Sequence, residues 1–198
     1  MTHQFFITDT YNRLKDTILN FDKTDVPNIY VISFYISNDG DDPRRPMLTV
    51  GYNTVQRWTS CIPSNGQEAN WPIASDSDEA RWNYAFWLQN EELVIGDHNY
   101  DPVIDWVKDS PYYYTDEQEE EDFEKTYELG EQIQNKFIDI VISHAKRLHS
   151  EGVIRATFKK DIPIIIHELE YYDKPLDWTR QGNPPHLIKE FDNWVTTF

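Results

Sequence analysis

The hydrophobic pattern of the chain is organised around residues 161–173, DIPIIIHELEYYD, which contain three consecutive isoleucines. Successive side chains of a strand point to opposite faces, so an unbroken run of β-branched residues requires cover on both faces. Pro163 cannot donate a hydrogen bond to a neighbouring strand, and it fits the beginning of a strand better than its middle. The pattern therefore predicts an inner strand over residues 162–171.

Beyond the isoleucines, the predicted strand becomes polar. His167 shares one face with Ile165, whereas Glu168 and Glu170 share the other face with Ile166. An ordinary strand that leaves the core has this pattern. The functional alternative is a cleft at the end of the strand, lined by His167, Glu168 and Glu170, in which the two carboxylates act as a pair. His167 and Glu170 cannot hold one metal ion together from a regular strand, because they lie on opposite faces.

Other strands are predicted where hydrophobic and polar positions alternate or where β-branched residues cluster. These segments are residues 28–37, 47–52, 92–96 and 153–158. The stretch NDGDDPRRP at residues 38–46 is rich in turn-forming residues. The strands on either side of it are therefore expected to form an antiparallel hairpin.

Helices are predicted where apolar residues recur every three or four positions. The segments with this spacing are residues 8–21, 102–108 and 186–195, together with a short helix that ends at Trp58 and is capped by Asn53 or Thr54. Residues 78–88, DEARWNYAFWL, fit both patterns, and a capping residue at Ser77 favours a helix. The segments together predict a single α+β domain over residues 1–198, in which a mainly antiparallel sheet is covered by α-helices.

The longest helical pattern covers residues 116–149. Its apolar stripe consists of Phe123, Tyr127, Phe137, Val141, Ala145 and Leu148. Acidic residues crowd its beginning and basic residues its end, as the helix dipole favours. Gly130 is a position at which this helix is expected to bend or break.

The acidic beginning of this helix, DEQEEEDFE, is the sharpest charge feature of the chain. Acidic residues at a helix N-terminus commonly form a solvated face and nothing more. The functional alternative is that the run imitates the phosphates of a nucleic acid and occupies a basic active site. The residues predicted to bind a partner in this way are Glu117, Glu119, Glu120, Glu121 and Asp122.

A second candidate contact surface consists of Arg81, Trp82 and Trp87, joined by the distant Trp106. Arginine and aromatic residues are enriched at binding hot spots, so these side chains are expected to frame a groove. The alternative is that the rings pack in the core and Arg81 pairs with one of the many carboxylates.

The charge of the chain restricts its partners. Its 198 residues include 18 basic and 35 acidic side chains, which give a formal net charge of −17. Binding to nucleic acid requires a basic surface, and anionic membranes are disfavoured for the same reason. Acidity alone keeps a protein soluble, but it also speeds encounter with a basic partner. The charge therefore predicts a basic protein as partner, with no nucleic acid and no membrane.

Cys61 is the only cysteine, so an intramolecular disulfide and CxxC sites are excluded. The N-terminal sequence MTHQFFITDTY lacks the basic and apolar segments of a signal peptide. No stretch approaches the roughly 18 apolar residues of a transmembrane helix. The reducing cytoplasm is the expected compartment.

Motifs for catalysis, metal binding and cofactor binding are missing from the sequence, which contains no GxGxxG, GxxxxGK[ST], HExxH or GxSxG. His144 and His149 are five residues apart and share a helical face poorly. We therefore predict no catalytic residue, no metal and no cofactor. A binding protein is the leading hypothesis, and an enzyme with a cleft around His167, Glu168 and Glu170 is the alternative.

Several segments, in order along the chain, resemble a bacterial domain-of-unknown-function family, family 4303. They are IYVISFYISNDG, LTVGYNT, EARWNYAFW, DIPIIIHELEYYD and NPPHLIKEFDNWV. Families of this kind are often encoded among the immunity proteins of contact-dependent or polymorphic toxin systems. The resemblance implies a cytoplasmic antidote that binds one cognate toxin, and it implies no catalytic residues. With the charge, it predicts an immunity-type protein that neutralises a basic toxin by occlusion.

Overall fold

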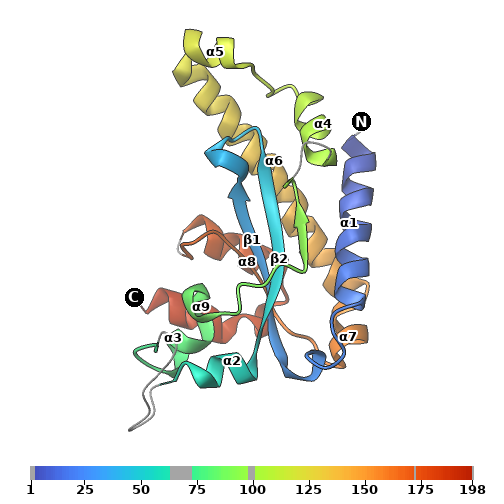
Figure 1. Cartoon of the computed structure of the whole chain (residues 1–198), viewed down its shortest axis with the longest axis vertical. Helices are drawn as coiled ribbons and strands as arrows, with labels where there is room; N and C mark the ends of the chain where they lie inside the picture. Colours follow the sequence, from blue (N-terminus) through green and yellow to red (C-terminus); the bar gives the residue numbers. More distant parts are fainter. Residues whose placement is uncertain (1–2, 63–72, 98–100, 172, 198) are drawn as a thin grey trace.

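The computed structural model describes residues 3–62, 73–97, 101–171 and 173–197. Its centre is a four-stranded sheet in the order β3–β2–β1–β4 (Figure 1). The strands are β1 (Ile29–Asn38), β2 (Pro46–Thr54), β3 (Leu93–Ile95) and β4 (Ile164–His167). β1 and β2 form the predicted antiparallel hairpin, and β3 is antiparallel to β2, whereas β4 is parallel to β1. The predicted α+β class is confirmed, with a sheet that is mixed rather than purely antiparallel.

Helices surround this sheet. The α-helices are α1 (His3–Leu19), α2 (Val55–Ser60), α3 (Ser77–Trp82), α4 (Pro102–Lys108), α5 (Asp116–Glu121), α6 (Phe123–Ser150), α7 (Val153–Phe158), α8 (Lys174–Gly182) and α9 (Lys189–Thr196). Short 3-10 helices are η1 (Val26–Asn28), η2 (Asp39–Asp41), η3 (Tyr84–Phe86) and η4 (Pro185–Leu187). The helices predicted near the N-terminus, after β2, at residues 102–108 and near the C-terminus are confirmed as α1, α2, α4 and α9.

Both faces of the sheet are covered, as the isoleucine run requires. Ile164 and Ile32 point into the main core with α1, α6 and α7, whereas Ile165 and Val31 point into a second core with α3 and α9. Neighbouring residues of each strand therefore belong to different cores, in keeping with the two-residue period of a strand.

β4 lies at an edge of the sheet and not inside it, and it is shorter than the predicted strand. Polar side chains of α8 and of the residue after it close the free edge. The Asn183 side chain accepts a hydrogen bond from Ile164 N at 2.8 Å and donates one to Ile164 O at 2.6 Å. The Thr179 hydroxyl likewise accepts a hydrogen bond from Ile166 N and donates one to Ile166 O, at 2.9 Å each. An open strand edge invites pairing with other chains, and these side chains replace a further strand there.

Residues 153–158, predicted as a strand, form helix α7 instead. Gly152 before it and Lys159 after it adopt left-handed backbone conformations, with φ of 72° and 61°. The chain therefore turns sharply at both ends of this helix. Ile154 and Phe158 are four residues apart and bury on one face in the main core. The apolar residues of this segment reflect burial and not strand pairing.

The long helix predicted over residues 116–149 is broken at Asp122, where φ is −150° and ψ is 81°. This break separates α5 from α6. Gly130, the predicted soft point, lies inside α6, and a Cβ there would come 2.9 Å from Pro43 Cβ in the β1–β2 turn. The glycine serves the close approach of the hairpin to the helix, and the break occurs where an aspartate caps a new helix.

The ambiguous segment 78–88 divides into α3 and η3. Asp76, and not the predicted Ser77, caps α3 by accepting hydrogen bonds from Asp78 N and Glu79 N at 2.9 Å each. α8, which closes the sheet edge, was not predicted from the sequence.

Candidate partner-binding site

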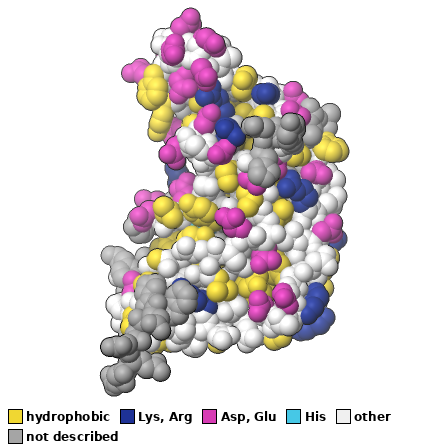
Figure 2. All heavy atoms as spheres, in the orientation of Figure 1, with side chains coloured by type: hydrophobic (Ala, Val, Ile, Leu, Met, Phe, Trp, Pro, Cys, Tyr) yellow, Lys and Arg dark blue, Asp and Glu magenta, His cyan; other side chains and the backbone are white. Residues whose placement is uncertain are grey.

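The acidic run occupies one end of the molecule, on α5 and the first turns of α6. We name this surface, residues 116–128, the acidic tip; Lys125 is its only basic residue. α6 extends beyond the sheet at this end, and α5 lies across its beginning (Figure 1). Figure 2 shows carboxylates crowded over this end of the molecule, with hydrophobic side chains beside them.

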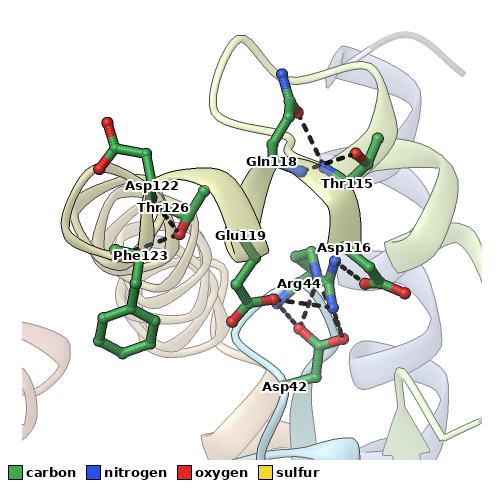
Figure 3. A network of polar contacts seen from close by, with 9 residues as sticks. All are labelled: Asp42, Arg44, Thr115, Asp116, Gln118, Glu119, Asp122, Phe123 and Thr126. Carbon is green, nitrogen blue, oxygen red and sulfur yellow. Dashed lines mark hydrogen bonds and ion pairs between the residues drawn. The ribbon is translucent and has the colours of Figure 1, made fainter.

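Two capping motifs shape the acidic tip. Gln118 N donates to Thr115 Oγ1 at 3.4 Å, and Thr115 N donates to Gln118 Oε1 at 3.0 Å, which forms a reciprocal capping box at the start of α5. Asp122 then caps α6, where its carboxylate accepts a hydrogen bond from Lys125 N at 3.1 Å. Because Asp122 leaves the helical conformation to form this cap, α5 does not continue the axis of α6 (Figure 3).

Arg44 in the β1–β2 turn fixes α5 to the hairpin (Figure 3). Its guanidinium lies 2.9 Å from Asp42, 2.6 Å from Asp116 and 3.6 Å from Glu119, and 4.9 Å above the Tyr114 ring. Burial acts to raise the pKa of Asp42, but hydrogen bonds from Arg44 outweigh it and lower that pKa. The hydrogen bond to Asp42 in turn raises the pKa of Arg44. The guanidinium therefore stays charged and joins two segments that are distant in sequence.

The structure divides the predicted partner-binding carboxylates into two groups. Glu119 pairs with Arg44, and Asp122 caps α6, so these two carboxylates hold the tip together. Glu117, Glu120 and Glu121 are exposed. Within the described part of the chain, none of these three makes an ion pair within 4.0 Å. These three are therefore available to a partner.

Two aromatic rings lie beside these carboxylates. Phe123 is 65% exposed and Tyr127 is 58% exposed, and their ring centroids are 6.3 Å apart. Both belong to the predicted apolar stripe of the helix, and they are exposed because they precede the part of α6 that faces the sheet. The Phe123 ring points away from the Arg44 network (Figure 3). Large exposed rings beside charged groups are typical of contact surfaces.

The second predicted contact surface, Arg81 with Trp82 and Trp87, is not an exposed groove. Trp82 and Trp87 are each only 2% exposed and belong to the second core. Arg81 lies 4.9 Å above the Trp58 ring and pairs with Glu190 at 2.5 Å. The two tryptophans are packing residues, and Arg81 fastens α9 to α3.

The predicted cleft at the end of the isoleucine strand is also wrong, because His167 is fully buried. Its Nδ1 lies 2.6 Å from Glu168 O, and its Nε2 lies 2.8 Å from Ser33 Oγ. A carbonyl oxygen only accepts, so Nδ1 carries the proton and Ser33 donates to Nε2. The rings of Tyr84 and Tyr171 pack at 4.7 Å and 5.3 Å. Burial lowers the pKa of His167 to about 4, so the ring is neutral at pH 7.

Glu168 and Glu170, the other two residues of the predicted cleft, are both exposed. Glu168 lines a hollow on the opposite side of the sheet from His167, and Glu170 does not line it. The three residues therefore do not form one site. The strand ends at His167, so the predicted alternation does not extend to Glu168 and Glu170, and the His167 side chain lies in the interior.

No group of three or more His, Cys, Asp or Glu residues is arranged to hold a metal ion among the described residues. No helix in the described ranges is long and apolar enough to cross a membrane. Comparisons of the chain with protein-family models, with curated proteins and with solved structures found no significant match.

Replacing Arg44 with methionine tests how the tip is held. Methionine keeps most of the aliphatic stem but leaves Asp42, Asp116 and Glu119 to repel one another. We expect the free energy of unfolding to fall by about 1–2 kcal/mol, because hydrogen-bonded charge pairs contribute more to stability than exposed ion pairs do. Amide hydrogen exchange in α5 should become about tenfold faster. Lys136→Met, which removes the exposed pair with Asp139, should change neither quantity appreciably; equal effects of both variants would contradict the anchoring role of Arg44.

Proposed function

We propose that this chain is a non-catalytic, immunity-type protein of the cytoplasm, which binds a basic toxin domain and neutralises it by occlusion. One observation carries the proposal. The acidic tip holds exposed carboxylates on a fixed helix, directly beside two exposed aromatic rings.

The two components of the tip have different roles in this proposal. Opposite electric fields accelerate encounter with a basic surface, and this contribution is screened beyond about 8 Å at physiological salt. Glu117, Glu120 and Glu121 supply that field. Phe123 and Tyr127 supply apolar contact area, which charge pairs alone do not provide. A toxin surface that binds phosphates offers lysine and arginine side chains both to these carboxylates and to these two rings.

The capping box and Arg44 support the occlusion mechanism. A surface that is already ordered loses little conformational entropy when it binds. The anchored α5 therefore presents its carboxylates as a preformed row. An enzyme built on His167 receives no support, because the ring is buried.

Association kinetics test the proposal. The tagged protein is used to capture partners at low and high salt from the organism that encodes it. A basic partner retained at low salt in equal stoichiometry is then purified. The variant Glu120→Gln/Glu121→Gln/Glu124→Gln removes three exposed carboxylates of the tip and leaves the Arg44 network and the Asp122 cap intact. Glu117 is kept because its carboxylate is hydrogen-bonded to Thr115 of the capping box. We expect its association rate with the purified partner to fall about tenfold, with a weaker salt dependence.

The matched control is Asp16→Asn/Asp78→Asn/Glu91→Gln, which removes the same charge from exposed positions outside the tip. A uniform charge effect would slow both variants equally and would reject the tip as the contact. The absence of any basic partner whose toxic activity this chain blocks would reject the proposed function itself.

A further inference from the structure

A hollow of about 290 Å³ opens beside the acidic tip, between α6, the β1–β2 turn and α8. We name it the side groove. Its lining residues are Asn38, Pro43, Tyr127, Gly130, Glu131, Gln134, Asn135, Ile138, Glu168, Lys174 and Trp178. Its lining includes Tyr127, which also belongs to the acidic tip, and Trp178 of α8, next to the edge strand β4.

The groove combines apolar walls with polar acceptors. Tyr127, Ile138 and Trp178 supply the apolar surface, and Glu131 and Glu168 supply carboxylates. The Gln134 side-chain amide donates to Asn38 Oδ1 at 2.5 Å, which orients its own oxygen as an acceptor. A long side chain with an apolar stem and a multiply donating head matches these walls.

The charge of the groove favours a cation. Lys174 is the only basic residue that lines it, against Glu131 and Glu168. Burial raises the pKa of Glu168, and Lys174 acts in the opposite direction. Among the described residues, neither glutamate forms an ion pair within 4.0 Å in the free protein. The groove therefore holds two carboxylates that no cation in the described part of the chain pairs with in the free protein, and one of them, Glu168, is also partly desolvated.

From these features we infer that the side groove binds an arginine side chain of the protein that the acidic tip engages. This inference rests on the proposed function and specifies its partner. The partner has a basic surface segment, and the arginine of this segment lies about one side chain's length from the residues that contact the tip. Arginine suits the groove better than lysine because its planar head makes several directed hydrogen bonds to carboxylates and stacks on aromatic rings. Tyr127 lies in both surfaces and joins the two contacts.

The test uses the complete ¹⁵N-labelled chain and short peptides, so it does not depend on identifying the natural partner. The probe is acetyl-Gly-Gly-Arg-Gly-Gly-amide, compared with the same peptide containing lysine or norleucine. We expect the arginine peptide to shift the backbone amide of Asn135 and the indole N–H of Trp178 in a saturable manner. The lysine peptide should bind about tenfold more weakly, and the norleucine peptide should cause no saturable shift.

Paired variants locate the binding. Glu168→Gln and Glu131→Gln should each weaken the arginine peptide about tenfold, whereas Glu170→Gln, on an exposed residue outside the groove, should leave its affinity unchanged. Asn135→Arg supplies a resident arginine and should abolish peptide binding, while a wild-type melting temperature shows that the fold is retained.

The outcomes separate this inference from the proposed function. Shifts confined to α5 amides would overturn the groove inference and leave the electrostatic role of the tip standing. Saturable binding in the groove without any basic partner in the capture experiment would support the arginine site and reject the immunity function. Equal binding of the arginine and norleucine peptides would overturn arginine recognition.

Discussion

Replacing Asn183 with alanine is expected to lower the free energy of unfolding by about 3–5 kcal/mol, because each buried polar group that is left without a partner costs about 1–3 kcal/mol. The side chain bonds both backbone groups of Ile164 and donates a further bond to Thr179 O at 2.8 Å. It also lies 3.1 Å from His149 Nε2. Alanine would leave a buried N–H and a buried carbonyl of β4 without partners. Urea unfolding monitored by tryptophan fluorescence measures the loss.

Two further variants assign this loss to the strand edge. Asn193→Ala removes an exposed asparagine on α9 and should change stability by less than about 0.5 kcal/mol. Thr179→Val keeps the side-chain shape but removes both hydrogen bonds to Ile166, and should cost about 2 kcal/mol. The Asn183 variant should also aggregate with time, because the open edge of β4 then accepts another chain. A stable, monomeric Asn183→Ala protein would show that the edge does not need its cap.

Acidification from pH 7 to pH 5 is expected to lower the free energy of unfolding by about 4 kcal/mol through two buried histidines. Burial lowers the pKa of His167 to about 4, and burial together with the charge of Arg147 lowers the pKa of His144 to about 4. An unfolded histidine has a pKa of about 6.5. Between these values the unfolded chain binds protons that the folded chain does not. This stability is therefore complete above pH 6.5, decreases as the pH falls, and reaches a lower plateau below pH 4.

The environments of the two rings account for the size of this effect. His144 Nε2 lies 2.9 Å from Thr10 Oγ1, whose own proton goes to Phe6 O, so the histidine donates. Tyr rings, and no carboxylate, pack against His167 in the described structure. Neither site offers a counter-ion to a protonated ring.

Urea midpoints at half-unit pH intervals measure the dependence. His167→Gln should be less stable at pH 7 but should lose about half of the slope between pH 6 and pH 5. A wild-type slope in the His167 variant would contradict the buried, neutral state of that ring.

The parts of the fold that were predicted correctly depend on short-range signals. Pro102–Lys108 is a helix in both the prediction and the structure, because Asp101 caps it and Pro102 suits its first position. The hairpin follows from alternation in two strands and a turn-rich connection. The run of isoleucines correctly required cover on both faces.

The errors concern information that lies outside each segment. The isoleucine run does not indicate whether its strand has a strand or a helix as its outer neighbour. The prediction of an inner strand for this segment is therefore wrong, because β4 lies at the edge. The residues that decide this, Thr179 and Asn183, have ordinary polar positions in the sequence. The apolar pattern of residues 153–158 fits a strand, but a short buried helix has the same pattern.

In the candidate site, too, the features that depend on short-range signals were predicted and those that depend on tertiary structure were not. Charge density identified the acidic tip, because exposed carboxylates need no tertiary information to be recognised. Trp82 and Trp87 do not frame a groove but pack in the core, as the alternative interpretation expected, whereas Phe123 and Tyr127 are the exposed rings. A helical stripe shows which residues share a face but not where the covering sheet ends. The Asp before Phe123 was the one local signal, since it fits a new helix cap.

The break at Asp122 has an evolutionary consequence. α5 is joined to the rest of the fold through its caps and through Arg44, and its own side chains contribute nothing to the buried cores. Substitutions at Glu120 and Glu121 therefore alter the presented surface without disturbing the packing of either core. If the proposed function holds, single substitutions on α5 can alter which partner is bound while the packing of the two cores stays unchanged.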